Sequence, residues 1–301
     1  MKPVLLTGAA GFIGRAVHRL LREMGTDCVA VDKHTSDSCD ENCGAILACD
    51  LTDTFSLNAL FGSHDFDTII HLAAVLPSAA AKDPIRATQV NIGASLALLE
   101  RAVFRRIRRF VFGSSTSVYG TAGTAAPISE QMPAAPSDVY GAAKRAVEMV
   151  GESLRQNGSI EFISLRIATV IGPGARNTSS PWRSEIFEKV ESGGKIAIPY
   201  AQDDPLTVVH VDDVARMLVK LAEAESVQHS VYNTPAELLS AGEIKRTVES
   251  IAPDLHIELT GRSRPLAPLA DGCRFANEFS FESTPLAESL RDALLHSSKQ
   301  I

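Results

Sequence analysis

The chain has 301 residues, of which 45% are hydrophobic and 22% charged, and its formal net charge at pH 7 is −7. This composition predicts a globular protein of one large domain or two, and the negative charge gives no general indication of a nucleic-acid partner. The opening apolar run Val4–Leu6 ends at Thr7 and is far too short to export the chain or to cross a membrane. We therefore expect a cytoplasmic protein that binds neither nucleic acid nor membrane.

The five cysteines are odd in number and are expected to be reduced thiols. Cys39, Cys43 and Cys49 lie close together in the sequence but lack the paired C-x-x-C spacing of structural zinc sites. No metal is predicted.

Short apolar runs alternate with helical patterns over the first half of the chain. Because the runs are almost continuously apolar, the predicted strands should be buried on both faces. The alternation predicts right-handed β-α-β units and an α/β fold with a Rossmann-type doubly wound parallel sheet. The predicted strands are Val4–Leu6, Cys28–Val31, Ile46–Ala48, Thr68–His71, Phe110–Phe112 and Phe162–Leu165. The predicted helices are Phe12–Met24, Pro84–Val103 and Val139–Gln156.

A glycine-rich turn directly follows the first predicted strand, in the sequence Thr7-Gly-Ala-Ala-Gly-Phe-Ile-Gly14. Its three glycines permit a tight turn, close approach of the backbone to a pyrophosphate, and close packing of helix on strand. The exposed amides of the following helix then face the anion. The pattern predicts dinucleotide binding by Gly8, Ala10, Gly11, Phe12, Ile13 and Gly14.

Asp32 stands at the end of the second predicted strand, 18 residues beyond Gly14. A carboxylate there accepts hydrogen bonds from the adenosine ribose and would repel a 2′-phosphate, which favours NAD over NADP. Lys33 weakens this preference, because a cation could accommodate the phosphate.

Five arginines gather where the helix Pro84–Val103 should end before the next strand. Cations are favourable near a helix C-terminus, so we expect a solvated helix end rather than an anion-binding patch. These residues are Arg101, Arg105, Arg106, Arg108 and Arg109.

Two polar stretches carry candidate catalytic groups. The sequence GSSTSVYG, residues 113–120, follows the strand Phe110–Phe112, although serine and threonine are also ordinary turn residues. Tyr140 and Lys144 are four residues apart on a predicted helix and therefore share one face. A nearby ammonium should lower the pKa of the phenol, as a general base for an alcohol requires.

Beyond Gly174 the chain is richer in proline and loops. We expect an NAD-binding domain over residues 1–172 and a smaller α/β, mainly substrate-binding region over 173–301, with some segments returning to the first domain. The predicted helices of this region are Trp182–Glu191, Asp213–Ala224, Gly242–Ile251 and Leu286–Leu295.

Over nearly its whole length the chain resembles the extended short-chain dehydrogenase/reductase family, in its epimerase/dehydratase branch. The resemblance rests on the glycine turn, Asp32, GSSTSVYG and the Tyr140-Gly-Ala-Ala-Lys144 motif, in that order. Further matching segments are Asp50-Leu51, His71-Leu72-Ala73-Ala74, Val90-Asn91, Leu165-Arg166, Gly172-Pro173-Gly174 and His210–Ala215.

The resemblance implies a role for each matching residue. Ser115 would hydrogen-bond the substrate oxygen, Tyr140 would take or give the proton, and Lys144 would lower the tyrosine pKa and hold the nicotinamide ribose. Arg166 is equally consistent with a structural role. Further cofactor-binding residues would be Asp50, Leu51, Leu72, Ala73, Ala74 and Asn91.

Departures from the family pattern restrict which reaction the protein is expected to catalyse. Dehydratases carry an Asp-Glu pair where this chain has Thr116 and Ser117, and nucleotide-sugar enzymes usually carry an arginine where it has Leu206. The leading hypothesis is therefore an NAD-dependent dehydrogenase acting on a secondary alcohol of a small sugar, sugar acid or hydroxy acid. The alternatives are a (nucleotide-)sugar 4-epimerase and, less favoured because Tyr140 and Lys144 are intact, a non-catalytic NAD-sensing regulator. The predicted substrate-binding residues are Ser78, Ser115, Thr116 and Arg176.

The family commonly dimerises through two helices, which here are Pro84–Val103 and Val139–Gln156, so a homodimer is expected. Small and apolar residues suited to such packing, or equally to an internal core, are Ala94, Leu98, Ala142, Ala146 and Val150.

Overall fold

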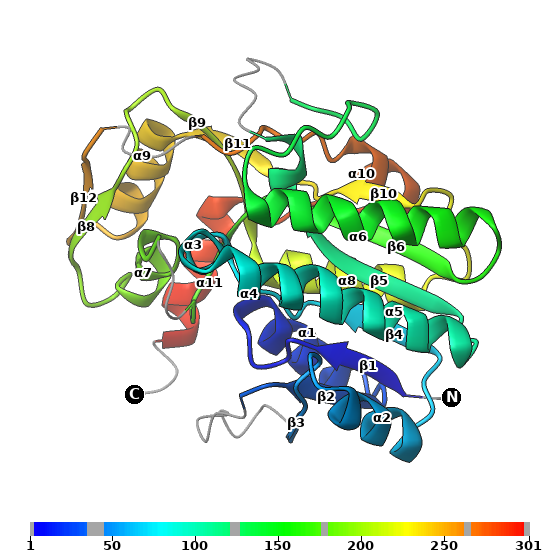
Figure 1. Ribbon diagram of the computed structural model, residues 1–301. Helices are drawn as coiled ribbons and strands as arrows, with labels where there is room; N and C mark the ends of the chain where they lie inside the picture. The colour runs from blue at the N-terminus through cyan, green and yellow to red at the C-terminus, as the bar shows by residue number, and fades with distance from the viewer. Residues whose placement is uncertain (1–2, 35–44, 121–126, 176–179, 262–265, 298–301) are drawn as a thin grey trace. The chain divides into compact units, whose positions relative to one another are not determined.

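The computed structural model describes residues 3–34, 45–120, 127–175, 180–261 and 266–297 (Figure 1). The chain forms two compact units, and neither is one continuous segment. Unit 1 comprises Met1–Gly120, Pro133–Arg166 and Ala215–Tyr232. Unit 2 comprises Thr121–Met132, Ile167–Val214 and Asn233–Ile301. The assignment of substrate binding to residues 173–301 stays a prediction.

A seven-stranded sheet forms the centre of unit 1, with the order β10-β6-β5-β4-β1-β2-β3. Strand β1 pairs in parallel with β2 on one side and β4 on the other, so the strand order reverses at β1. The carboxyl ends of β1 and β4 thus meet at the topological switch point, where such sheets bind ligands. The strands are β1 Val4–Thr7, β2 Cys28–Asp32, β3 Ile46–Ala48, β4 Thr68–His71, β5 Arg109–Ser115, β6 Glu161–Ile167 and β10 Val231–Asn233.

Helices cover both faces of this sheet, which confirms the predicted Rossmann-type α/β fold (Figure 1). Helices α5 and α6 lie in front of the sheet in Figure 1, and α8 lies behind it. Side chains of α2, α5 and α6 share one core with the sheet, in which Leu5, Ile69, Phe110 and Phe162 are fully buried. The helices that flank the sheet include α1 Phe12–Glu23, α2 Thr54–Ser63, α5 Ser95–Phe104, α6 Val139–Gln156 and α8 Val211–Glu223.

The predicted single helix Pro84–Val103 is divided. Helix α4, Pro84–Thr88, passes into a π-helical turn, η1, Gln89–Ala94, before α5 begins, and a short α3, Pro77–Lys82, precedes them. The hydroxyl of Ser95 donates to the carbonyl of Asn91 at 2.9 Å, one turn earlier in this segment. Such π turns inside helices occur frequently at functional sites.

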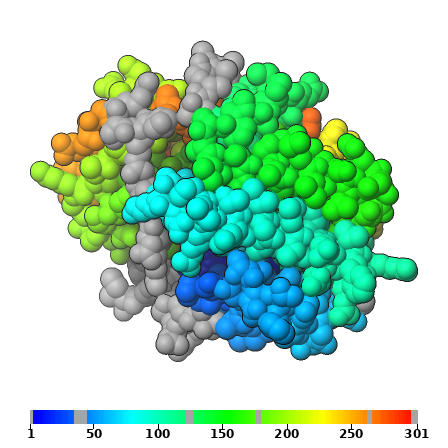
Figure 2. Space-filling view, viewed as in Figure 1, coloured from blue at the N-terminus to red at the C-terminus, as the bar shows by residue number. Residues whose placement is uncertain are grey.

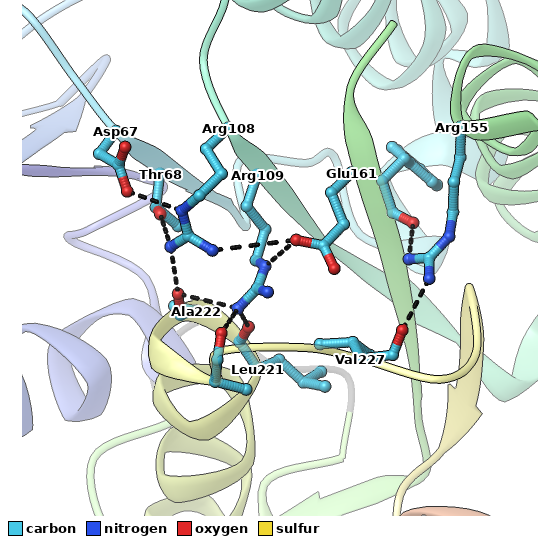
Figure 3. A network of polar contacts seen from close by, with 11 residues as sticks. Asp67, Thr68, Arg108, Arg109, Arg155, Glu161, Leu221, Ala222 and Val227 are labelled. Carbon is cyan, nitrogen blue, oxygen red and sulfur yellow. Dashed lines mark hydrogen bonds and ion pairs between the residues drawn. The ribbon is translucent and has the colours of Figure 1, made fainter. Parts of the chain in front are cut away.

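In the basic cluster, Arg105, Arg106 and Arg108 are exposed, as expected of a solvated helix end, but Arg109 is not. Figure 3 shows the contacts of Arg108 and Arg109. Arg109 is fully buried, pairs with Glu161 at 2.7 Å, and donates to the carbonyl of Leu221 at the C-terminal end of α8. Arg108 pairs with Asp67 at 2.9 Å. Because the free carbonyls at a helix C-terminus attract cations, these arginines fasten α8 to the start of β5.

Unit 2 has its own core and two small sheets. The sheets are β11-β9-β7, from Glu237–Ser240, Pro205–His210 and Thr169–Ile171, and the parallel pair β12-β8, from Leu255–Leu259 and Gly194–Ile198. Trp182, Ile186, Leu206 and Ile244 are buried in its core. Its helices are α7 Trp182–Glu188, α9 Ala241–Ile251, α10 Cys273–Phe279 and α11 Leu286–Ser297.

Two kinds of feature are absent from the described residues. None of their helices combines the length and the apolar character that a membrane span needs. Within the same residues, no group of three or more His, Cys, Asp or Glu side chains could hold a metal ion. Cys39 and Cys43 lie outside the described residues.

Candidate active site

The glycine turn between β1 and α1 is sterically closed to larger residues. Gly8 has φ +72°, and a Cβ atom there would lie 2.6 Å from the amide nitrogen of Ala73. A Cβ atom on Gly14 would lie 2.0 Å from the carbonyl oxygen of Gly8. The turn, the start of α1 and the Leu72–Ala74 segment after β4 are thus packed backbone against backbone, as the close approach of a dinucleotide requires.

The first turn of α1 leaves its amides open. Gly11 is the N-cap residue and supplies no side-chain hydrogen bond, and the first turn contains no acidic residue. The first amides of a helix have no partner within the helix and carry its positive dipole end. This end of α1 therefore fits a pyrophosphate group.

Asp32 at the end of β2 has an oriented carboxylate. One oxygen, Oδ2, accepts from the amide of Ala10 at 3.1 Å, and Oδ1 accepts from the amide of His34 at 3.1 Å. The carboxylate thus lies beside the glycine turn, where an acidic side chain can bind the ribose of NAD. The residues present fit NAD.

Asp50, predicted on the adenine side, has a strong local pairing. Its Oδ2 forms an ion pair with Lys33 Nζ at 2.6 Å, and its Oδ1 accepts from the amide and the hydroxyl of Thr52. The bond from Lys33 is the main cause that holds the pKa of Asp50 at about 2. Leu51 follows it and is half-buried; the contact of both residues with adenine stays a prediction.

A buried hydrogen-bond chain joins β1, β4 and α5. Thr7 Oγ1 lies 2.6 Å from His71 Nδ1, and His71 Nε2 lies 2.8 Å from Ser95 Oγ. Because the Ser95 hydroxyl donates to Asn91, it accepts from His71, which places the imidazole proton on Nε2. Burial lowers the pKa of His71 to about 3, with a smaller contribution from Lys144, so the ring is neutral.

Asn91, in the π turn, holds the segment after β4. Its Oδ1 accepts from the amide of Val75 at 2.7 Å, and its Nδ2 donates to the carbonyl of Val75 at 2.9 Å. Asn91 is 2% exposed. Its role in this structure is therefore to position backbone, and a direct contact with the cofactor stays a prediction.

Ser115, Tyr140 and Lys144 come together at the end of β5 and the start of α6. The side chain of Ser115 lies close enough to the phenol of Tyr140 to lower its pKa, and the Ser115 hydroxyl lies 3.1 Å from the hydroxyl of Ser117. Lys144 Nζ donates to the carbonyl of Gly113 at 2.6 Å and lies 5.7 Å from the centroid of the Tyr140 ring. The three side chains that the sequence singled out thus form one cluster.

The start of α6 is fixed by Asp138 and Gly141. Asp138 is the N-cap residue, and its carboxylate accepts from the amide of Gly141 at 2.7 Å. A Cβ atom on Gly141 would lie 2.4 Å from the carbonyl oxygen of Ser117. Glycine therefore lets the first turn of α6 contact the Ser115–Ser117 turn, which brings Tyr140 to Ser115.

The tyrosine pKa differs from the expectation. Burial raises the pKa of Tyr140 to about 12, the hydrogen bond from Ser115 opposes this increase, and the charge of Asp138 adds to it. Burial also lowers the pKa of Lys144 to about 8, against the opposing effect of Glu148. Desolvation of the phenol is thus the largest effect on the Tyr140 pKa, and the lowered pKa expected from the Tyr140–Lys144 spacing is not found.

The structure adds one charged residue to the site that the sequence analysis missed. Glu148 is fully buried one helical turn after Lys144, and Arg166 donates to both of its oxygens, at 3.0 and 2.7 Å. Ser114 also donates to Glu148, at 2.6 Å. Glu148 could have been found from the sequence, because it lies four residues after Lys144 and therefore on the same helix face.

The other polar candidates for the site are Tyr119, Thr116, Ser78 and Arg176. Tyr119 is buried, and its hydroxyl accepts from Arg166 at 2.8 Å, which makes it part of the support beneath the site. Thr116 is 4% exposed, and Ser78 lies exposed on the short helix α3. Arg176 lies outside the described residues. Substrate binding by Ser78, Thr116 and Arg176 stays a prediction.

Comparison with known proteins places this geometry in a family. The model of the NAD dependent epimerase/dehydratase family matches residues 4–234. An uncharacterized epimerase/dehydratase of Staphylococcus haemolyticus is 26% identical over 268 residues, and the alignment covers 86% of this chain and 83% of the relative.

Two solved structures share the fold over almost the whole chain. The GalE-like L-threonine dehydrogenase of Cupriavidus necator superposes with a TM-score of 0.89 at 20% identity, covering 98% of this chain and 99% of the other. MoeE5 in complex with UDP-glucuronic acid and NAD superposes with a TM-score of 0.82 at 27% identity, covering 99% and 100%. The chain therefore belongs to the NAD dependent epimerase/dehydratase family, is an enzyme of that family, and uses NAD as its cofactor.

Proposed function

We propose that this enzyme is a dehydrogenase that oxidises a secondary alcohol of a small sugar, sugar acid or hydroxy acid, with Tyr140 as the general acid and base. The observation that carries the proposal is the proximity of Ser115, at the end of β5, to Tyr140 and the buried Lys144, at the start of α6. Acceptance of the substrate hydride is the chemistry that NAD supplies when bound.

The protein residues handle the proton of the alcohol. The Ser115 hydroxyl hydrogen-bonds the reacting oxygen, and Tyr140 exchanges the proton with that oxygen. A phenol with a pKa of about 12 is protonated at neutral pH, which is the form that delivers a proton to a carbonyl. For alcohol oxidation the phenolate is needed, and the interaction with Ser115 favours it by lowering the pKa of Tyr140.

The substrate class is proposed from position 206. Leu206 stands where nucleotide-sugar enzymes of this family usually carry an arginine, and its side chain is buried in the core of unit 2. A leucine supplies no charge to a diphosphate. The fold itself is shared by a threonine dehydrogenase and by a protein that binds UDP-glucuronic acid, so the fold alone does not choose between the two classes.

A (nucleotide-)sugar 4-epimerase is the second candidate. It is favoured by the 27% identity to MoeE5 in complex with UDP-glucuronic acid and NAD. The same three side chains would serve it, with the hydride returned to the opposite face of the substrate.

The test offers the enzyme NAD⁺ and a panel of polyols, sugar acids, hydroxy acids and UDP-sugars. The formation of NADH is measured for each compound. Tyr140→Phe keeps the aromatic ring and should lower turnover by at least about 100-fold, the usual contribution of a positioned general acid or base. The matched control is Tyr119→Phe, which removes the hydroxyl that Arg166 contacts and should retain most of the activity. An unimpaired Tyr140→Phe enzyme would contradict the proposed role. Conversion of a UDP-sugar without net NADH would instead identify an epimerase.

A homodimer and a cytoplasmic location complete the proposal. Helices α4, α5 and α6 form one face of unit 1 in Figure 2, and large apolar side chains are exposed on them. These exposed residues are Ile85, Phe104, Met149 and Val150. Ala94 and Leu98, by contrast, are buried inside unit 1 and pack in its own core.

A further inference from the structure

The pair of Lys33 and Asp50 bears on the choice between NAD and NADP. Lys33 directly follows Asp32 at the end of β2, where a cation can accommodate the 2′-phosphate of NADP. In the structure its ammonium is 2.6 Å from the carboxylate of Asp50. The cation that the sequence alone would offer to a phosphate is therefore already paired.

The partner carboxylate is itself held in place. Asp50 Oδ1 accepts from the amide of Thr52 at 3.0 Å and from its hydroxyl at 2.7 Å, which leaves Oδ2 directed to Lys33. Asp32 is oriented in the same way by the amides of Ala10 and His34. The carboxylate of Asp50 thus holds the ammonium of Lys33. With the neighbouring carboxylate of Asp32, the net charge on these three side chains is negative.

We propose that Asp50 is a specificity-determining residue that restrains Lys33 by an ion pair and thereby reinforces the preference of the enzyme for NAD over NADP. Asp32 disfavours the 2′-phosphate directly. Asp50 acts by withholding the neighbouring cation and by adding a second negative charge. This inference rests on the use of NAD and is independent of the reaction proposed above.

The pair is partly exposed, so its effect should be moderate. The side chains of Lys33 and Asp50 are 47% and 31% exposed. Exposed ion pairs contribute up to about 1 kcal/mol, which corresponds to a factor of about five in an equilibrium constant. Release of Lys33 should thus change the ratio of the two dinucleotide affinities by about three- to fivefold.

The experiment measures binding of NAD⁺ and NADP⁺ to the full-length protein by isothermal titration calorimetry, without substrate. The quantity compared is the ratio of the two dissociation constants, in which shared contacts to the adenine cancel. Asp50→Asn should shift this ratio towards NADP⁺ by about five- to tenfold, because it releases Lys33 and removes a negative charge. In a Lys33→Gln background the same substitution should shift the ratio by about twofold.

Two further variants keep the test decisive. Asp53→Asn removes a carboxylate three residues away that caps α2 through the amides of Phe55 and Ser56, and it should leave the ratio within about twofold. Lys33→Gln alone should also leave it within about twofold, because a restrained lysine contributes little to phosphate binding. A shift by Asp50→Asn that is equal with and without Lys33 would overturn the proposal, as would a strong loss of NADP⁺ binding in Lys33→Gln alone. Since the readout is binding, an absence of turnover on every alcohol tested would not affect it.

Discussion

Replacement of Glu148 by glutamine tests the buried charge pair beneath the candidate site. The carboxylate is fully buried, and four N–H or O–H groups donate to it. Arg166 donates to both oxygens, so whichever way the amide of a glutamine is turned, its NH₂ group faces an N–H of Arg166. Arg166 is 3% exposed, and its guanidinium would lose both a hydrogen bond and its counter-charge.

The expected cost follows from that geometry. Removing one partner of a buried ion pair destabilises a protein by about 3–5 kcal/mol, because the other charge stays buried without compensation. This is a large part of the total stability of about 5–15 kcal/mol that is typical of a folded protein. The loss should be measured by equilibrium urea unfolding followed by far-ultraviolet circular dichroism.

A matched variant and a double-mutant cycle make the result specific. Glu152→Gln removes a half-buried partner of Arg145 on the same helix and should cost less than about 1 kcal/mol. Arg166→Met together with Glu148→Gln removes both charges, so the double variant should cost about 2 kcal/mol less than the sum of the single variants. Additive effects, or a Glu148→Gln cost no larger than that of Glu152→Gln, would refute the reasoning.

Two further predictions concern pH and assembly. The pKa of Lys144 is about 8 in the folded protein, whereas its ordinary value is 10.5. Between pH 8 and pH 10.5 the side chain is therefore protonated in the unfolded chain and neutral in the folded chain. Because the unfolded chain binds more protons in this range, the contribution of Lys144 to the free energy of unfolding rises with pH. We expect the difference in free energy of unfolding between the wild type and Lys144→Met, measured by urea titration, to change in favour of the wild type by up to about 3 kcal/mol from pH 8 to pH 10.5. A difference that stays constant with pH would contradict this prediction. Met149, 58% exposed on α6, should lie in the dimer interface. Met149→Glu should accordingly halve the mass measured by light scattering, and a monomeric wild type would disprove the dimer.

The sequence alone determined the strand-helix order of unit 1 and the chemistry-bearing positions at the strand ends. Almost continuous apolar runs predicted β1 to β6, because the strands of a parallel sheet are usually buried on both faces. The expected burial is wrong for the edge strand β3, in which Leu47 and Ala48 are exposed. Helix α6 was predicted with its observed bounds, Val139–Gln156. Asp32 could be recognised because it lies at the end of a predicted strand, and Tyr140 and Lys144 because they share one helix face. Ser115 was singled out among the hydroxyls of residues 113–120 only by the resemblance to the family.

Tertiary structure decided what these residues contact. The π turn at Gln89–Ala94 was not predicted, because its apolar spacing is close to that of an α-helix. Arg109 was expected in solvent, but it is buried between Glu161 on β6 and the carbonyl of Leu221 on α8, 112 residues later in the chain. Pairings of this kind depend on which elements the fold brings together.

Charge and protonation also depended on the tertiary structure. Spacing placed Lys144 near Tyr140 and predicted a lowered tyrosine pKa, whereas burial raises it, and the depth of burial cannot be read from spacing. The sequence also indicated that Lys33 could bind the phosphate of NADP, whereas in the structure Lys33 forms an ion pair with Asp50. A sequence shows which groups can ionise, but their distances and their exposure to water arise only when the distant segments pack together.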